Sequence, residues 1–144
     1  MTVRKILDQK GGDVLLAERG DTITKTVAAM CERGVGSAIV IGPDGLPLGI
    51  LTERDVLRQF ARHGEQLGRQ STGELMSSPV HTTTPDASIE SVMELMTRHR
   101  FRHVPVVEDN ALVGIISIGD VVKARLKETE AEAESMRQYI ATSY

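Results

Sequence analysis

Aromatic side chains are scarce in this chain, whose 144 residues include two tyrosines, two phenylalanines and no tryptophan. Proteins that bind single-stranded nucleic acid stack the bases on aromatic rings, so this composition gives that class of function little support. Blocks of lysine and arginine are also missing, and the formal net charge is −3. Nonspecific binding to nucleic acid needs concentrated positive charge, and we therefore expect no nucleic-acid partner.

Cysteine and long apolar runs are equally rare. The only cysteine, Cys31, rules out a disulfide within the chain. No apolar stretch approaches the ~20 residues that span a membrane, and residues 1–8 lack the apolar centre of a signal peptide. These absences predict a cytoplasmic protein without a membrane partner.

The histidines, the cysteine and the carboxylates of this chain are not spaced as in known metal sites or catalytic motifs. The histidines have no metal-ligand spacing among them, so we expect no metal site at His63, His81, His99 or His103. Cys31 lies on the apolar side of a predicted helix and is expected to be a small buried hydrophobe. No Ser/His/Asp triad and no pair of carboxylates stands at a spacing that favours catalysis. We therefore expect no enzyme activity.

One motif occurs twice. Residues 49–55 read Gly-Ile-Leu-Thr-Glu-Arg-Asp, and residues 114–120 read Gly-Ile-Ile-Ser-Ile-Gly-Asp. The copies begin close to half a chain length apart, and each follows a hydrophobic run rich in β-branched residues. Upstream, the apolar pattern of residues 23–30 returns in residues 89–96. A duplication in this order predicts two similar units that pack on each other, with the function where they meet.

The predicted elements follow the same duplication and give an α/β fold. In the first half we predict helices over residues 3–8, 22–33 and 53–63, and strands over 13–17, 38–41 and 48–51. In the second half we predict helices over residues 74–76 and 88–98 and from 118 onward, and strands over 80–83, 104–107 and 112–116. We take 1–63 as the first unit, 64–73 as a polar linker and 74–126 as the second unit.

The last predicted helix extends toward residue 140, past its counterpart in the first half. A heptad seam of apolar or small residues runs along it, at Val122, Leu126, Thr129, Ala133, Met136 and Ile140. Such a seam needs a partner, which is either the body of its own fold or the same helix of a second chain. We favour self-association, and assign residues 127–144 to a C-terminal extension that supports a homodimer.

The repeated motif has two interpretations, and both use the same atoms. In the first, Thr52 and Ser117 are helix N-caps, and Asp55 and Asp120 complete their capping boxes. In the second, the free N–H groups of the helix N-terminus bind an anion, the hydroxyl contacts a phosphate or sugar, and the carboxylate accepts hydrogen bonds from a ribose diol. Two copies that face each other would then form two nucleoside-sized clefts. The sequence allows this second interpretation without requiring it.

These residues resemble a known family. Two tandem β-α-β-β-α units, each ending in Gly, two hydrophobic residues, Thr or Ser, two variable residues and Asp, are similar to a pair of CBS (cystathionine β-synthase) domains, also called a Bateman module. The resemblance runs from about residue 13 to residue 126, and Arg-His-Val-Pro-Val-Val at residues 102–107 fits the family's strand pattern. It implies two units packed through their sheets with pseudo-twofold symmetry. With no catalytic domain beside them, we expect a stand-alone pair.

The resemblance also implies regulatory binding of an adenosine compound: AMP, ADP, ATP, NAD or S-adenosylmethionine. By position in the motif, Asp55 and Asp120 would hold ribose hydroxyls, and Thr52 and Ser117 would contact ribose or phosphate. Ile50 and Ile115 would flank the adenine. Each cleft would borrow residues from the opposite unit, which adds as candidates Thr84, Arg102, His103 and Val104 for the Asp55 cleft, and Glu18, Ser37 and Ala38 for the Asp120 cleft. Arg54, Arg102 and His103 are the candidate cations for phosphate.

The two clefts are expected to differ. The first unit has Gly36-Ser37 where the second has Arg102-His103, so positive charge favours the Asp55 cleft. Glu18 stands where the second unit has Thr84, and a carboxylate beside a phosphate is unfavourable. The leading hypothesis is a non-catalytic ligand sensor whose halves shift when an adenine nucleotide binds. The alternatives are a structural dimerisation module without a physiological ligand and, with least support, a small nucleotide-processing enzyme.

Overall fold

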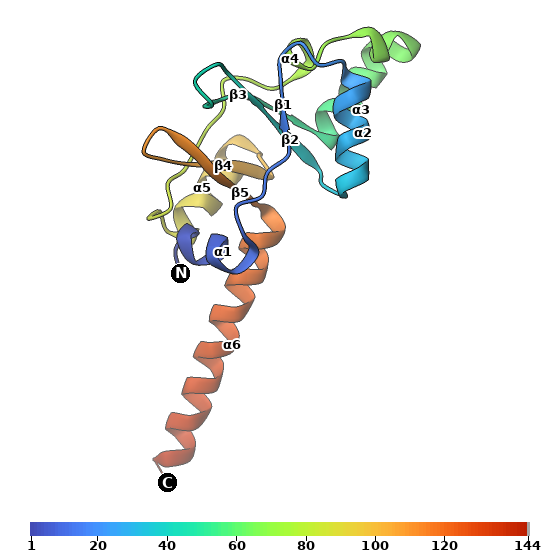
Figure 1. Cartoon of the computed structure of the whole chain (residues 1–144). Helices are drawn as coiled ribbons and strands as arrows, with labels where there is room; N and C mark the ends of the chain where they lie inside the picture. Colours follow the sequence, from blue (N-terminus) through green and yellow to red (C-terminus); the bar gives the residue numbers. More distant parts are fainter. Residues whose placement is uncertain (144) are drawn as a thin grey trace.

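Two α/β half-units make up the computed structural model, which describes residues 1–143 (Figure 1). In the first half, β1 (Leu16–Ala17), β2 (Ser37–Ile41) and β3 (Pro47–Thr52) form one sheet in the order β1-β2-β3. Strand β1 runs parallel to β2, and β2 and β3 form an antiparallel hairpin. The helices α2 (Ile23–Arg33) and α3 (Glu53–His63) complete this half, so the predicted α/β class is confirmed.

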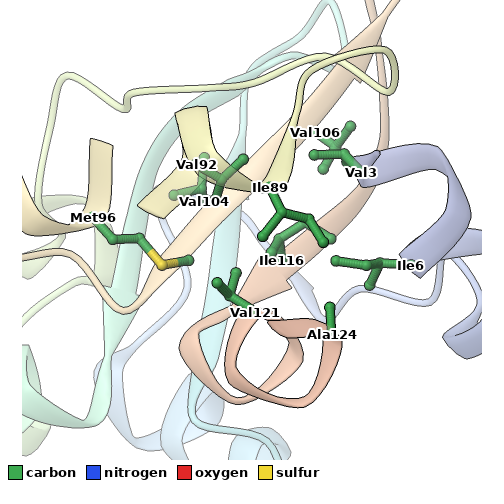
Figure 2. Close-up of a cluster of buried hydrophobic side chains, with 10 residues drawn as sticks. All are labelled: Val3, Ile6, Ile89, Val92, Met96, Val104, Val106, Ile116, Val121 and Ala124. Atoms are coloured by element: carbon green, nitrogen blue, oxygen red, sulfur yellow. The ribbon is translucent and has the colours of Figure 1, made fainter. Parts of the chain in front are cut away.

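The second half repeats the hairpin and its helices. Strands β4 (His103–Glu108) and β5 (Ala111–Ser117) pair antiparallel, between α5 (Ile89–His99) and α6 (Ile118–Thr142) in the chain. The apolar residues of α5 recur at helical spacing, so that one face of the helix is buried against the hairpin. Figure 2 shows the resulting core, formed by Val3, Ile6, Ile89, Val92, Met96, Val104, Val106, Ile116, Val121 and Ala124.

Short helices cross between the halves. The helix α1 (Val3–Lys10) opens the chain, yet its Val3 and Ile6 belong to the core of the second half (Figure 2). The helix α4 (Thr72–Leu75) precedes the second half, yet its Leu75 belongs to the core of the first. Each half is therefore completed by a helix that lies before the other half in the sequence. The unit boundaries proposed from the sequence stay a prediction, and the packing crosses them.

The segment predicted as a polar linker is largely structured. Residues 64–69 form the 3₁₀ helix η1 (Gly64–Arg69), and Leu67 is buried in the first core. Ser71 then caps α4, and its hydroxyl accepts a hydrogen bond from the Glu74 backbone N–H at 3.2 Å. The glycines and polar residues of this segment thus form a short helix and a cap rather than an open connection.

The predicted strand over residues 80–83 is wrong in extent. Only Thr83 pairs, through a single parallel bridge to Val106 in β4. Its backbone N–H donates to the Pro105 carbonyl at 3.0 Å, and its carbonyl accepts from the Val107 N–H at 2.9 Å. Pro79 and Pro85 flank the segment, and proline lacks the N–H that a longer ladder needs.

Cys31 was predicted to be buried, and this is wrong. It lies on the surface of α2, because the buried face of this helix passes through Ile23, Thr26 and Met30. Met93 on α5 is likewise exposed, since Ile89, Val92 and Met96 occupy the inner face. In both helices the apolar stripe is narrower than the run of apolar residues in the sequence.

The C-terminal helix α6 projects away from the rest of the fold (Figure 1). Val121 and Ala124 near its start are buried in the second core. Further along, the seam residues Val122, Leu126, Met136 and Ile140 are each more than half exposed. The helix was predicted to extend past its counterpart, which the structure confirms, and among residues 1–143 its seam is not covered.

Candidate ligand-binding cleft

A cleft of about 360 Å³ lies between the two halves, beside the first copy of the repeated motif. One wall comes from Gly36 just before β2, from β3 and from the first turns of α3. The other wall comes from the end of α5 and the segment that links it to β4. Ser77, which follows α4, completes the lining. The lining residues are Gly36, Ile50, Thr52, Glu53, Arg54, Asp55, Arg58, Ser77, His99, Arg100, Phe101, Arg102 and His103.

The motif forms a complete capping box at the bottom of this cleft. The Thr52 hydroxyl accepts from the Asp55 backbone N–H at 3.2 Å, and the Thr52 backbone N–H donates to Asp55 Oδ2 at 2.9 Å. Asp55 Oδ2 also accepts from the Thr52 hydroxyl at 3.1 Å. The helix-cap interpretation is therefore confirmed, and it places a buried carboxylate at the N-terminus of α3, where the helix dipole stabilises negative charge.

Ser77 binds the other oxygen of the same carboxylate. Its hydroxyl donates to Asp55 Oδ1 at 2.8 Å. Its backbone pairs with Ile50 in β3, with hydrogen bonds of 3.0 Å and 2.9 Å between the two residues. The segment after α4 is thus attached to the end of β3, and it orients Asp55 from the side opposite to the cap.

Positive charge gathers around the cleft. Arg54 and Arg58 lie one helical turn apart on α3, and Arg100 and Arg102 come from the facing segment. Arg100 ends α5 in the left-handed conformation, with φ of 58°. Two carboxylates, Glu53 and Asp55, also line the cleft. The arginines outnumber them, so the cleft attracts anions.

His103 lies at the start of β4 with its Nδ1 buried, and among residues 1–143 this atom has no hydrogen-bond partner. Burial lowers the pKa of His103 below its ordinary value of 6.5, because a charged imidazolium is costly to bury. Lys10 and Arg102 act in the same direction, whereas Glu53 and Asp120 oppose them. His103 is therefore neutral at pH 7 without ligand, which differs from the cation expected from the sequence.

The second copy of the motif forms an equivalent capping box. The Ser117 backbone N–H donates to Asp120 Oδ2 at 2.8 Å, and the Asp120 N–H donates to the Ser117 hydroxyl at 3.2 Å. A further donor approaches here, since Lys10 Nζ lies 2.7 Å from Asp120 Oδ2 and 2.8 Å from the Ile115 carbonyl oxygen. The motif is thus repeated in structure, with a lysine at the second copy in place of Ser77.

The structure brings six of the residues expected from the sequence together in the first cleft. These are Ile50, Thr52, Arg54, Asp55, Arg102 and His103. Ile115, Ser117 and Asp120 form the second motif site. Two other residues were expected at this cleft, but Val104 is buried in the second core, Thr84 is exposed, and neither lines it. Of the residues expected at the Asp120 site, Ser37 and Ala38 are buried in β2 and Glu18 is exposed, and their role there stays a prediction.

Several lining residues were missed by sequence reasoning. Arg58 could have been predicted, because it stands four residues after Arg54 and therefore on the same side of the predicted helix. Arg100 and Phe101 followed a predicted helix end and offered no motif. Ser77 had no signal in the sequence, since it reaches Asp55 through a crossing segment.

Two further classes of site were searched in residues 1–143. No three His, Cys, Asp or Glu side chains within this part of the chain come together as metal ligands. The same residues contain no helix with the length and apolarity to cross a membrane.

Known proteins resemble this chain in sequence and in fold. The family model described as CBS domain matches residues 73–127. The mitochondrial CBS domain-containing protein CBSX3 of Arabidopsis thaliana is 33% identical, over 99% of this chain and 73% of that protein. The crystal structure of the CBS-domain containing protein ATU1752 from Agrobacterium tumefaciens is 40% identical and covers 87% of this chain and 99% of that one, with a TM-score of 0.83.

A more distant structural neighbour carries ligands. It is the CBS domain pair of protein MJ0100, in complex with 5′-methylthioadenosine and S-adenosyl-L-methionine. That chain is 22% identical, and the match covers 89% of this chain and 98% of that one with a TM-score of 0.77. At this identity the likeness concerns the fold.

Proposed function

This chain belongs to the CBS-domain family, and we propose that it is a non-catalytic regulatory module that binds an adenosine phosphate in the Asp55 cleft. The ligands we have in mind are AMP, ADP, ATP and NAD. One observation carries the proposal. The same cleft between the halves is lined by a buried carboxylate that can accept hydrogen bonds from a ribose, Asp55, and by four arginines.

Asp55 is suited to accept a ribose hydroxyl. A carboxylate offers about four acceptor positions. Thr52 uses two of them on Oδ2, and Ser77 uses one on Oδ1. One ribose hydroxyl can therefore bind Oδ1 directly, and a second can replace the Ser77 hydroxyl. Ile50, half-buried in the same lining, offers an apolar surface for the base.

The arginines favour a ligand with phosphates. Arg54 and Arg58 reach the cleft from α3, and Arg100 and Arg102 reach it from the facing segment. Arginine binds phosphate through paired charge-assisted hydrogen bonds. S-Adenosylmethionine, which the MJ0100 pair binds, carries a sulfonium cation that these side chains would repel. We therefore place nucleotides ahead of it for this chain, and a bound phosphate would also favour the protonated form of His103.

A signal would arise because the cleft has walls from both halves. A ligand that contacts α3 on one side and the Arg100–Arg102 side on the other stabilises the relative pose in which both sets of contacts form. A partner protein that recognises this pose would read the occupancy of the cleft. The same proposal includes the cytoplasmic location that the cysteine usage predicts.

We also propose that the module works as a homodimer. The exposed seam of α6 lies at heptad spacing, and charges of both signs flank it, with Lys123 and Lys127 near its start and Glu130 and Glu134 further on. A second copy of the chain supplies the complementary seam. This surface also supports the second candidate function, a structural dimerisation module in which the clefts have no physiological ligand.

A thermal-shift screen separates these candidates. The purified chain is tested with AMP, ADP, ATP, NAD and S-adenosylmethionine, because a ligand that binds only the native state raises the melting temperature. We expect a phosphorylated ligand to give the largest shift and Asp55→Ala to abolish it. Glu94→Ala is the matched control, since Glu94 is an exposed carboxylate on α5 that does not line the cleft. No shift with any ligand would favour the structural module instead.

A further inference from the structure

The end of α1 covers the second copy of the motif. Lys10, the last residue of this helix, donates from Nζ to Asp120 Oδ2 at 2.7 Å and to the Ile115 carbonyl oxygen at 2.8 Å. By the internal repeat, Ile115 and Asp120 correspond to Ile50 and Asp55 of the first cleft. The Lys10 ammonium group therefore contacts Asp120, and Asp120 is the equivalent of Asp55, which we propose binds the ribose.

A crossing helix approaches each motif from the other half, α4 at the first motif and α1 at the second. At the first motif the segment after α4 supplies Ser77, whose short hydroxyl binds Asp55 beside an open cleft. At the second motif Lys10, the last residue of α1, contacts the carboxylate through a long cationic side chain. The two sites thus share one architecture and differ in the residue that meets the carboxylate.

The lysine is held in place by packing as well as by charge. Val3 and Ile6 anchor α1 in the second core. A Cβ added at Gly114 would lie 2.7 Å from Leu7 Cδ2, and one at Gly12 would lie 2.5 Å from the Val113 carbonyl oxygen. The end of α1 is therefore in close contact with β5, directly beside the motif.

The electrostatics of the pair agree with a stable contact. The side chains of Lys10 and Asp120 are 30% and 22% exposed, so the ion pair is only partly screened by water. Burial by itself would raise the pKa of Asp120, but the hydrogen bond from Lys10, with help from Ser117, outweighs it and holds this pKa below the ordinary value.

We propose that Lys10 is an internal occupant of the second nucleotide cleft, so that the free chain offers one open cleft and the second opens only when Lys10 leaves Asp120. The nucleotide part of this inference rests on the proposed function. A ligand for the second cleft must displace an ammonium that already satisfies the carboxylate, and that displacement lowers its affinity relative to the Asp55 cleft. The segment after α1 leads into β1 of the first half, so release of Lys10 would also loosen a connection between the halves.

The position of Lys10 is testable without any nucleotide. The full chain is acetylated with a limiting amine-reactive reagent, and the rate at each lysine is read by mass spectrometry. Lys5, on the same helix and exposed, is the internal reference. We expect Lys10 to react several-fold more slowly than Lys5, and Asp120→Asn to remove most of this difference. Equal rates in the wild-type chain would overturn the proposal.

Calorimetric titration with ATP tests the consequence for binding. We expect one site per chain in the wild type and two in Lys10→Ser, which copies the residue type of the first cleft. The added site should be lost in Lys10→Ser/Asp120→Ala, and Lys5→Ser should leave one site. Fewer sites or weaker binding in Lys10→Ser would show that Lys10 is a ligand-binding residue and would overturn the proposal.

The two experiments separate the two claims. If neither ATP nor any ligand of the thermal-shift screen binds these variants, the proposed function fails, while slow acetylation of Lys10 that depends on Asp120 still supports its place at the second motif. If ATP binds the wild type at one site and Lys10→Ser gains none, the proposed function stands and the inference about Lys10 falls.

Discussion

Thr52 and Asp55 cap α3, and the same atoms belong to the site that we propose for the ribose. The cap orients Asp55 through Oδ2, and Ser77 fixes it through Oδ1, so the carboxylate has a defined position before any ligand arrives. Preorganisation of this kind lowers the entropic cost of binding. The first glycine of the motif has a structural role, because a Cβ at Gly49 would collide with Met76 in the segment that brings Ser77 to the cleft.

Acidification should destabilise the protein through His103. Its pKa in the folded protein is lowered by burial, so the unfolded chain takes up a proton near pH 6.5 while the folded protein remains neutral until a lower pH. The free energy of unfolding should therefore fall as the pH drops through 6.5 toward the folded pKa. Urea unfolding at a series of pH values measures this slope.

His103→Asn should reduce that slope, whereas His63→Asn, which changes an exposed histidine outside the cleft, should leave it as in the wild type. A slope that survives in His103→Asn would assign the pH dependence to another group. Binding of a phosphate in the cleft should weaken the effect, because it favours the charged imidazole.

A buried pair of threonine hydroxyls links α2 to α4. Thr26 Oγ1 and Thr72 Oγ1 lie 2.7 Å apart, and both residues are buried. Thr72→Val leaves the Thr26 hydroxyl without this partner, and we expect a loss of about 1–3 kcal/mol in the free energy of unfolding. Urea denaturation measures this loss, and Thr97→Val, at an exposed position on α5, is the control.

The double variant Thr26→Val/Thr72→Val should recover part of the lost stability. A double variant less stable than Thr72→Val would contradict this explanation.

Residues within a local pattern could be predicted from the sequence, and residues that act across the fold could not. The caps at Thr52 and Ser117 follow from short-range rules and are confirmed. Ser77 and Lys10 reach their carboxylates through segments that cross between the halves, and no spacing in the sequence encodes such a contact.

At the scale of elements, the long helices and both hairpins were predictable because their apolar periodicity is strong. The prediction that failed concerns a short segment whose conformation depends on its neighbours. Residues 80–83 are rich in β-branched residues, but only Thr83 pairs with a strand. The assignment of residues 64–73 as a linker stays a prediction, although their composition did not indicate the burial of Leu67 in η1.

The exposed part of α6 should carry self-association. Truncation after Arg125 removes most of the exposed seam and keeps Val121 and Ala124 in the second core. We expect a lower mass by light scattering and a folded body by circular dichroism. Because the truncation also removes Glu128, which binds the N-terminal amine at 2.8 Å, Leu126→Lys/Met136→Lys serves as a second variant. A mass unchanged in both variants would contradict the role of the seam.

At the scale of the whole molecule, the crossing helices tie the two halves together. Because α1 lies before the first half but packs in the second core, and α4 lies before the second half but packs in the first, unfolding of one half would strain the chain that holds a helix in the other. We expect one cooperative transition in differential scanning calorimetry, with equal calorimetric and van't Hoff enthalpies per cooperative unit. Two separable transitions would show that the halves are independent domains.

A crystal structure of the chain grown with ADP would show whether an adenosine phosphate binds between the halves at Asp55. We expect the ribose within hydrogen-bond distance of Asp55 and the phosphates among Arg54, Arg58, Arg100 and Arg102, with Lys10 still on Asp120 at the second motif. ADP bound elsewhere, or an Asp55 cleft that stays empty at saturating ADP, would contradict this expectation.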